Sequence, residues 1–221
     1  MHRRQAYFLT GTDTEVGKTF AACALLGVAA RQRFSTLGMK PVAAGTDVQG
    51  RNQDVEDLLA ASSIKAPREL VNPVCLKAPV APHIAAADEG RPISLETISS
   101  AFAKLRTLAD FVVVEGVGGF VVPLGENVDS ADLARTLDLP VILVVGLRLG
   151  CINHALLTAE AIRARGLGLA GWIANRIDPG MARWQENVAT LAARLDAPLL
   201  GVLPRLETPD SLAASDFLKL P

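Results

Sequence analysis

A glycine-containing segment that ends in Gly17-Lys18-Thr19 is the part of this sequence best suited to chemistry. It spans residues 11–19, directly after a short apolar run, and it leads into a segment with helical spacing. Backbone N–H groups at a helix start bind phosphate, a loop lysine reaches the outer phosphates of a nucleotide, and a threonine hydroxyl binds Mg²⁺. The strict spacing puts glycine at Thr12, whereas Gly11 lies one residue earlier. The segment therefore predicts a phosphate-binding loop, with a tight turn as the alternative.

Three further charged side chains could serve such a loop. Glu115 ends an apolar run, and a carboxylate there is costly unless it is paired or bound to a metal. Lys40 is suited to act as a second cation for a transferred phosphoryl group, although a solvated lysine is the equal alternative. Asp54, on physics alone, is interpreted as a helix cap or a first-turn acid. Glycines after Glu115 would let the backbone approach a ligand closely.

The elements that must position these side chains alternate along the chain. Continuous apolar runs predict buried strands at residues 6–9, 37–42, 111–114, 141–145, 171–174 and 199–203. Helical spacing predicts helices at residues 18–32, 54–61, 94–108, 151–165 and 181–195. The alternation predicts an α/β fold, with residues 1–221 forming a single domain around a doubly wound, mainly parallel sheet. Ligands of such sheets bind at the carboxyl ends of the strands. The proline-rich residues 67–92 predict a long surface connection.

Charge and composition argue against several classes of function. Lys and Arg number 22 against 23 Asp and Glu, so no overall field favours nucleic acid or an anionic membrane. No run approaches the roughly 20 apolar residues of a membrane span, and the first apolar run is too short for a signal peptide, which predicts a cytoplasmic location. The spacing of Cys23, Cys75 and Cys151 fits neither a disulfide framework nor a zinc site. His83 and His154 have no acid or nucleophile at a useful spacing, so we predict no catalytic role for them.

The sequence resembles the dethiobiotin synthetase family over nearly its whole length. The matching segments are residues 11–19, 40–43, 115–119, 140–146, 150–154, 170–175 and 198–201. The displaced first glycine is itself part of that family's loop. The resemblance implies a P-loop NTPase type of α/β fold and a ligase of biotin biosynthesis. In that reaction 7,8-diaminononanoate, CO₂ and ATP give dethiobiotin, ADP and phosphate, through a carbamate that is phosphorylated and then attacked by the neighbouring amine.

The resemblance also implies roles for individual residues. Catalysis would involve Lys40, Lys18 and Thr14, with the two lysines holding the γ-phosphate and the carbamate. Mg²⁺ would bind Thr19, Asp54 and Glu115, which replaces the interpretation of Asp54 as a helix cap. The nucleotide would contact Asp13, Thr14, Glu15, Val16, Gly17, Lys18, Thr19, Phe20, Asp54, Glu115, Gly116, Val117, Gly118, Asn175, Arg176, Pro204, Arg205, Leu206 and Ser211. The diamine substrate would contact Thr14, Glu15, Lys40, Ala44, Gly118, Gly150, Cys151, Ile152 and Asn153. In the family the segment 150–153 comes from the partner subunit, so a homodimer is implied.

Departures from the family pattern leave open how the diamine and the nucleotide base are recognised. Ala44 stands where the family usually has serine, which removes one hydrogen bond near the substrate. Ser211 stands where the family often has asparagine. Residues 175–178 are similar to the guanine-reading Asn-Lys-x-Asp pattern, with Arg176 for lysine, so GTP is the alternative to ATP.

Two other functions are compatible with a phosphate loop on such a sheet. A nucleotide-driven switch or partitioning ATPase would typically carry a second lysine early in the loop, where this chain has Asp13. An amidotransferase-type synthetase would need a glutaminase domain, for which we expect no room in this chain. The synthetase is therefore the predicted function.

Overall fold

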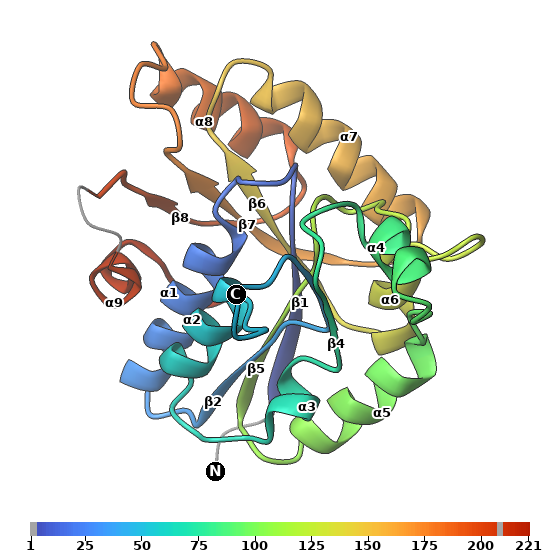
Figure 1. Ribbon diagram of the computed structural model, residues 1–221. Coiled ribbons are helices and arrows are strands. Elements are labelled where there is room, and N and C mark those ends of the chain that lie inside the picture. The colour runs from blue at the N-terminus through green and yellow to red at the C-terminus, as the bar shows by residue number, and fades with distance from the viewer. Residues whose placement is uncertain (1–3, 207–209) are drawn as a thin grey trace.

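The computed structural model describes residues 4–206 and 210–221, and a six-stranded sheet lies at its centre (Figure 1). The strand order is β2-β5-β1-β6-β7-β8, and neighbouring strands run parallel. The strands are β1 (Gln5–Gly11), β2 (Thr36–Met39), β5 (Phe111–Glu115), β6 (Val141–Gly146), β7 (Leu169–Asn175) and β8 (Leu199–Leu203). The predicted α/β fold with a mainly parallel sheet is confirmed.

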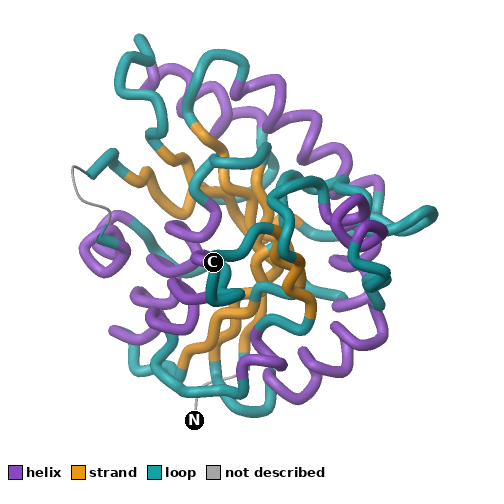
Figure 2. Tube along the Cα trace, in the orientation of Figure 1, coloured by secondary structure: helices purple, strands orange, loops and turns teal. Residues whose placement is uncertain are grey.

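Helices cover both faces of this sheet, as Figure 2 shows. The helices are α1 (Lys18–Arg31), α2 (Gln53–Ala61), α3 (Arg68–Val71), α4 (Pro82–Asp88), α5 (Leu95–Leu105), α6 (Ser130–Leu137), α7 (Cys151–Ala164), α8 (Trp184–Arg194) and α9 (Ser211–Ala214), followed by a 3-10 turn, η1 (Ser215–Phe217). Neighbouring strand residues point to opposite faces, so Phe8 packs with α5 and α6 while Leu9 packs with α1. Strands covered on both sides explain why β5 and β6 are buried at every position.

The prediction of one strand over residues 37–42 is wrong, and the difference forms part of the site. The strand β2 ends at Met39, and a separate strand, β3 (Val42–Ala44), pairs in parallel with β4 (Val74–Leu76) in a small second sheet. Lys40 and Pro41 form the break, because Pro41 has no N–H to donate to a strand partner. The N–H of Lys40 donates instead to the carbonyl of Val71, at 2.9 Å.

The prediction of a surface connection over residues 67–92 is also wrong. The segment contains α3, β4 and α4, and its side chains Val71, Leu76 and Ala85 are fully buried. Two of its prolines lie at helix starts, where the missing N–H costs nothing, with Pro82 in the first turn of α4. These prolines therefore mark the starts of short helices. The segment is not a surface connection, because each of its short elements buries an apolar side chain.

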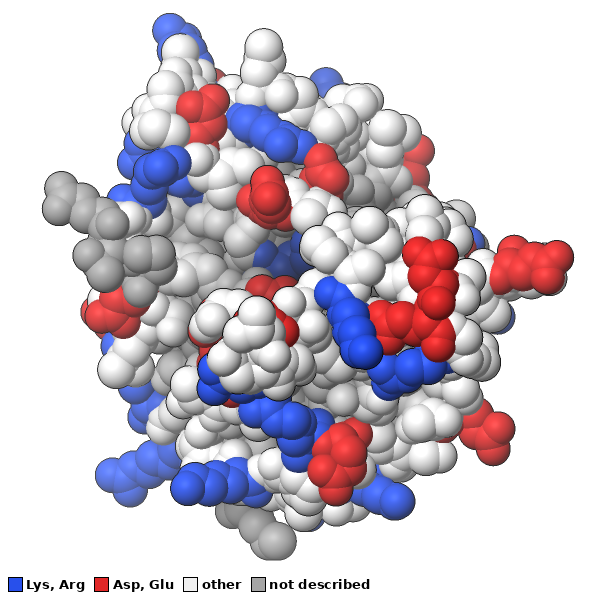
Figure 3. All heavy atoms as spheres, viewed as in Figure 1, with Lys and Arg blue, Asp and Glu red and all other residues white. Residues whose placement is uncertain are grey.

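Outside residues 67–92, the helices α6 and α9 were also not predicted from the pattern, and several helix ends differ from those predicted. The helix α6 begins with a capping box in which the Asp129 and Asp132 side chains and backbone N–H groups bond reciprocally. The predicted helix 181–195 begins at Trp184, and the predicted helix 94–108 ends at Leu105. Within the described ranges, no helix has the length and apolarity that crossing a bilayer requires. Acidic and basic side chains are interspersed over the face in Figure 3, whose middle is hollowed.

Candidate active site

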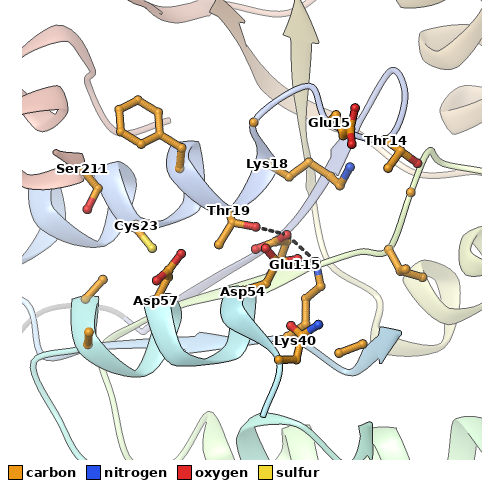
Figure 4. Close-up of a pocket in the computed structure, with 18 of the residues that line it drawn as sticks. Thr14, Glu15, Lys18, Thr19, Cys23, Lys40, Asp54, Asp57, Glu115 and Ser211 are labelled. Carbon is orange, nitrogen blue, oxygen red and sulfur yellow. Dashed lines mark hydrogen bonds and ion pairs between the residues drawn. The ribbon is translucent and has the colours of Figure 1, made fainter. Parts of the chain in front are cut away.

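A cleft of about 820 Å³ opens where β1, β2 and β5 end (Figure 4). The phosphate loop and the first turns of α1 form one wall, and α2 forms the opposite wall. The loop after β5 and the start of α9 also contribute to its lining. This is the edge of a parallel sheet at which ligands bind, and the volume suits a nucleotide-sized molecule.

The phosphate loop has a backbone that two glycines make possible. Gly17 has a φ of 83°, and a Cβ atom there would lie 2.1 Å from Nδ2 of Asn175. That Nδ2 donates to the carbonyl of Val16 at 2.9 Å, which ties β7 to the loop. A Cβ atom at Gly11 would lie 2.6 Å from a methyl carbon of Val16. The early glycine is therefore required by close packing inside this loop, which explains its departure from the strict spacing.

Lys18 points into the cleft, and its Nζ donates to the carbonyl of Asp13 at 2.9 Å. Burial, together with repulsion from Lys40, lowers the pKa of Lys18 to about 8. An anion bound beside this ammonium would stabilise its charged form, which burial disfavours. The loop is thus arranged to bind an anion such as a phosphate group.

Buried Lys40 lies at the centre of an ion cluster with two carboxylates (Figure 4). Its Nζ is 2.5 Å from Oε1 of Glu115 and 2.9 Å from Oδ2 of Asp54. The Thr19 hydroxyl donates to the same Oε1 of Glu115 at 2.8 Å. Glu115 is 0% exposed and Lys40 is 3% exposed, whereas the Asp54 side chain is 43% exposed, so the Lys40–Glu115 pair is shielded from solvent and Asp54 faces the open cleft.

The fold brings these four side chains together from distant parts of the chain. Met39 pairs with Val114, so the next residues, Lys40 and Glu115, emerge side by side from β2 and β5. Thr19 is the second residue of α1, and Asp54 is the second residue of α2. The cap of α2 is Asn52, whose side chain accepts from the N–H of Val55. The interpretation of Asp54 as a cap is therefore wrong, whereas its place in the first turn is confirmed.

The charges in this cluster shift one another's ionisation. Burial alone would lower the pKa of Lys40, but the attraction of Glu115 and Asp54 outweighs it and raises that pKa. Burial raises the pKa of Glu115, and the Lys40 ammonium opposes the rise. Burial also favours the neutral form of Asp54, but Lys40 holds the pKa of that carboxyl below its usual value. Lys40 consequently keeps its positive charge at neutral pH.

The oxygen atoms around Lys40 fit a divalent cation carried by a nucleotide. They come from the Thr19 hydroxyl and the carboxylates of Asp54 and Glu115, and Oε2 of Glu115 is buried without a hydrogen-bond partner among the described residues. Residues 4–206 and 210–221 contain no group of three or more His, Cys, Asp or Glu side chains that could hold a metal. A small set of oxygen ligands is nevertheless the usual one for Mg²⁺, which takes its remaining ligands from phosphate oxygens and water.

Most of the residues predicted for the reaction centre line this one cleft. Those present are Thr14, Glu15, Gly17, Lys18, Thr19, Phe20, Lys40, Ala44, Asp54, Glu115, Val117, Gly118 and Ser211. A Cβ atom on Gly118 would lie 3.6 Å from the Thr14 hydroxyl oxygen, so these two predicted substrate contacts are neighbours.

Other predicted residues lie outside the lining of the cleft. They are Asp13, Val16, Gly116, Asn175, Arg176, Pro204, Arg205 and Leu206, together with Gly150, Cys151, Ile152 and Asn153. Arg176 lies over the ring of Trp184, 4.6 Å from its centroid, and Arg205 donates to the carbonyl of Ile177. Residues 150–153 form the start of α7, where Gly150 has a φ of 93°. Within one chain, therefore, the residues predicted for the base and for the far end of the substrate lie outside the cleft lining, although Asn175 contacts the phosphate loop.

Sequence reasoning missed several residues that line the cleft. They are Cys23, Gly27, Ala43, Asn52, Asp57, Ala60, Ala61 and Leu212. Helical periodicity offered a signal for some of them, because Asp57 is three residues after Asp54 and Cys23 is four residues after Thr19. Burial raises the pKa of the Cys23 thiol to about 12, so this cysteine contributes shape and not a thiolate.

Comparisons with known proteins agree with this geometry. A family model described as an AAA domain matches residues 5–211. The ATP-dependent dethiobiotin synthetase of Aromatoleum aromaticum is 60% identical over 224 residues, covering 100% of both chains. That of Nitrosospira multiformis is 54% identical, covering 98% of this chain and 95% of its own length.

Among solved structures, a ParA family ATPase of Chlorobium tepidum superimposes with a TM-score of 0.58 at 16% identity, covering 96% of this chain and 89% of its own. The MinD cell division protein of Aquifex aeolicus has a TM-score of 0.56 at 15% identity, covering 96% and 86%. At such low identities these two structures share the fold alone.

Proposed function

The chain belongs to the dethiobiotin synthetase family of ATP-dependent ligases, and we propose that its cleft closes the cyclic urea of dethiobiotin. The substrates would be 7,8-diaminononanoate, CO₂ and ATP, and the other products ADP and phosphate. The observation that carries this proposal is the pair of buried lysines, Lys18 and Lys40, at one cleft beside a phosphate loop. A carbamate and a γ-phosphate are both anions, so they react only where cations hold them together.

In the proposed reaction, one amine nitrogen first adds to CO₂ and loses a proton, which gives the carbamate. A carbamate oxygen attacks the γ-phosphorus, and the bond from that phosphorus to ADP breaks. The neighbouring amine nitrogen then attacks the carbamate carbon, and the C–O bond to phosphate breaks as the ring closes. Lys18 would neutralise the transferred phosphoryl group, and Lys40 would hold the carbamate oxygens. Thr14 and Gly118, neighbours at the cleft wall, would position the diamine.

A Mg²⁺ ion would be held by Thr19, Asp54 and Glu115. When bound, it would neutralise charge on the phosphate oxygens. The support is the oxygen donor set and the unpartnered Oε2 atom of buried Glu115.

The far end of the substrate would be bound by a second copy of the chain. The N–H groups at the start of α7, residues 150–153, suit a carboxylate, but these residues do not line the cleft of their own chain. A homodimer that shares its sites is therefore part of the proposal. A mixture of Lys40→Ala and Ile152→Glu chains should recover about a quarter of wild-type activity, because half of the dimers would hold one intact site. Two inactive variants that stay inactive when mixed, despite exchanging subunits, would contradict shared sites.

Adenine is the proposed base, bordered by Asn175, Arg176, Pro204, Arg205 and Leu206, with Ser211 nearby. The Asp178 carboxylate, the candidate guanine reader, accepts from the N–H of Gly180 through its Oδ1 at 2.8 Å, so part of its hydrogen-bonding capacity is used within its own turn. In a competition assay with labelled ATP, we expect GTP to compete poorly and Asp178→Asn to change neither affinity. Tighter binding of GTP than of ATP would identify the guanine alternative as correct.

The decisive experiment measures phosphate release and product together. With ATP and Mg²⁺ present, phosphate should appear only when both diaminononanoate and bicarbonate are added, and mass spectrometry should detect the cyclic urea. A nucleotide switch or partitioning ATPase would release phosphate without the diamine. The relatives that this chain matches over nearly its full length are dethiobiotin synthetases and do not favour that alternative. The cytoplasmic location stays a prediction from the sequence.

A further inference from the structure

Lys40 makes the contacts that a bound cation would make with the same carboxylates. Its ammonium lies within 2.9 Å of both Asp54 and Glu115 and shares Oε1 of Glu115 with the Thr19 hydroxyl. These are the three side chains proposed above to hold Mg²⁺, so this inference rests on the proposed magnesium site. A lysine that is 3% exposed has little freedom to leave them for solvent.

We propose that Lys40 and the divalent cation compete for Asp54 and Glu115, so that Lys40 serves as an internal counter-cation until the metal binds. Two positive centres on neighbouring oxygens of the Glu115 carboxylate would lie only a few ångströms apart, and because Glu115 is fully buried their repulsion there is only weakly screened by water. The cation therefore gains full access to Glu115 as Lys40 moves off it. The displaced ammonium then turns to the anions in the cleft.

This competition couples the metal to the anionic ligands. An anion that draws Lys40 away from the carboxylates strengthens cation binding, and by thermodynamic reciprocity a bound cation strengthens the binding of that anion. Lys40 thereby acts as a positioning residue for the metal site as well as a contact of the substrate. In the part of the chain that the structure describes, Lys18 lies in the same cleft without an ion pair or hydrogen bond to either carboxylate, and its Nζ donates to the carbonyl of Asp13.

The test measures Mn²⁺ binding to the full chain by electron paramagnetic resonance, with no nucleotide, diamine or bicarbonate present. Lys40→Met should bind Mn²⁺ at least about tenfold more tightly than the wild type, because the competitor has been removed. Lys18→Met is the matched control, since it removes one positive charge from the same cleft without freeing a carboxylate, and its affinity should change much less. Lys40→Arg keeps the charge and should stay near the wild type. Equal gains for Lys40→Met and Lys18→Met, or no gain for either, would overturn the proposal.

A measurement on the wild type keeps the test independent of whether Lys40→Met folds. With ¹³C-labelled lysine, the Cε resonance of Lys40, assigned through Lys40→Arg, should move on addition of Mg²⁺, while that of exposed Lys65 should not. An unmoved Lys40 resonance at saturating Mg²⁺ would mean that the ion binds without displacing the lysine. Both measurements omit the substrates of ring closure. Failure to make the cyclic urea would therefore refute the proposed function without affecting this result.

Discussion

The phosphate end and the base end of the proposed nucleotide site differ in how firmly the chain fixes them. At the phosphate end, Lys40 and Glu115 are buried and bonded to each other where two paired strands stop. At the base end, Arg176 is half-buried on Trp184, and exposed Arg205 donates to the carbonyl of Ile177. The sheet thus positions the side chains proposed for the chemistry, whereas those proposed to recognise the base lie largely in loops.

Loss of Lys40 should have the largest effect on activity, because it removes a buried cation from the phosphate end of the site. Lys40→Ala is expected to lower kcat by about 10³-fold while leaving ATP affinity largely intact. Steady-state kinetics and equilibrium binding of an ATP analogue would measure the two effects, with exposed Lys65→Ala as the control. A variant that loses only nucleotide affinity would place Lys40 at the nucleotide and not at the carbamate.

The backbone of the phosphate loop should be the next most sensitive feature. Gly17→Ala combines a φ of 83° with a clash against Asn175, and we expect it to lose about 2–4 kcal/mol in the free energy of unfolding. Gly50 has a φ of 75° with nothing within 4 Å of an added Cβ atom, so Gly50→Ala should lose only about 1 kcal/mol. Urea unfolding of both variants separates clash from strain. Equal losses would show that the contact between the loop and Asn175 contributes little.

The pH dependence of ATP binding probes Lys18 at the same end. Because its pKa is about 8, ATP affinity should fall above pH 8 by up to about tenfold per pH unit, and Lys18→Arg should remove this dependence. The free energy of unfolding changes with pH in the opposite direction to the ATP affinity. The folded pKa lies below the unfolded value of 10.5, so this lysine makes the free energy of unfolding rise between about pH 8 and 10.5. A calorimetric titration from pH 7 to 9.5 would measure the affinity. An unchanged pH profile in Lys18→Arg would assign the dependence to another group.

The smallest expected effect concerns the missing hydroxyl at Ala44, which is half-buried in the cleft lining. Ala44→Ser should lower the KM for the diamine about fivefold at unchanged kcat, since one net hydrogen bond contributes about 1 kcal/mol. Ala60→Ser adds a hydroxyl elsewhere in the same cleft and serves as the control. A KM that does not respond in either variant would show that the diamine bypasses residue 44.

Much of the reaction centre followed from local pattern, and some of the surrounding fold did not. Gly17, Lys18 and Thr19 are recognisable because a strand, a loop and a helix follow one another directly in the chain. The segment 67–92 was misread because β4 and α3 are only three and four residues long, too short to show a period. The helix α6 was missed although Asp129 and Asp132 carry the spacing of a cap.

The sequence by itself determined the phosphate loop, the alternation of strands and helices, and the carboxylate that ends β5, because these depend on neighbouring residues. Only the tertiary structure decided that Lys40 is a buried ion-pair partner and not a solvated lysine. It also decided that Asp54 faces that lysine while Asn52 caps the helix. The reason is that β2 and β5 bring residues 40 and 115 together across 75 positions, and strand pairing over that separation leaves no periodic trace in the chain.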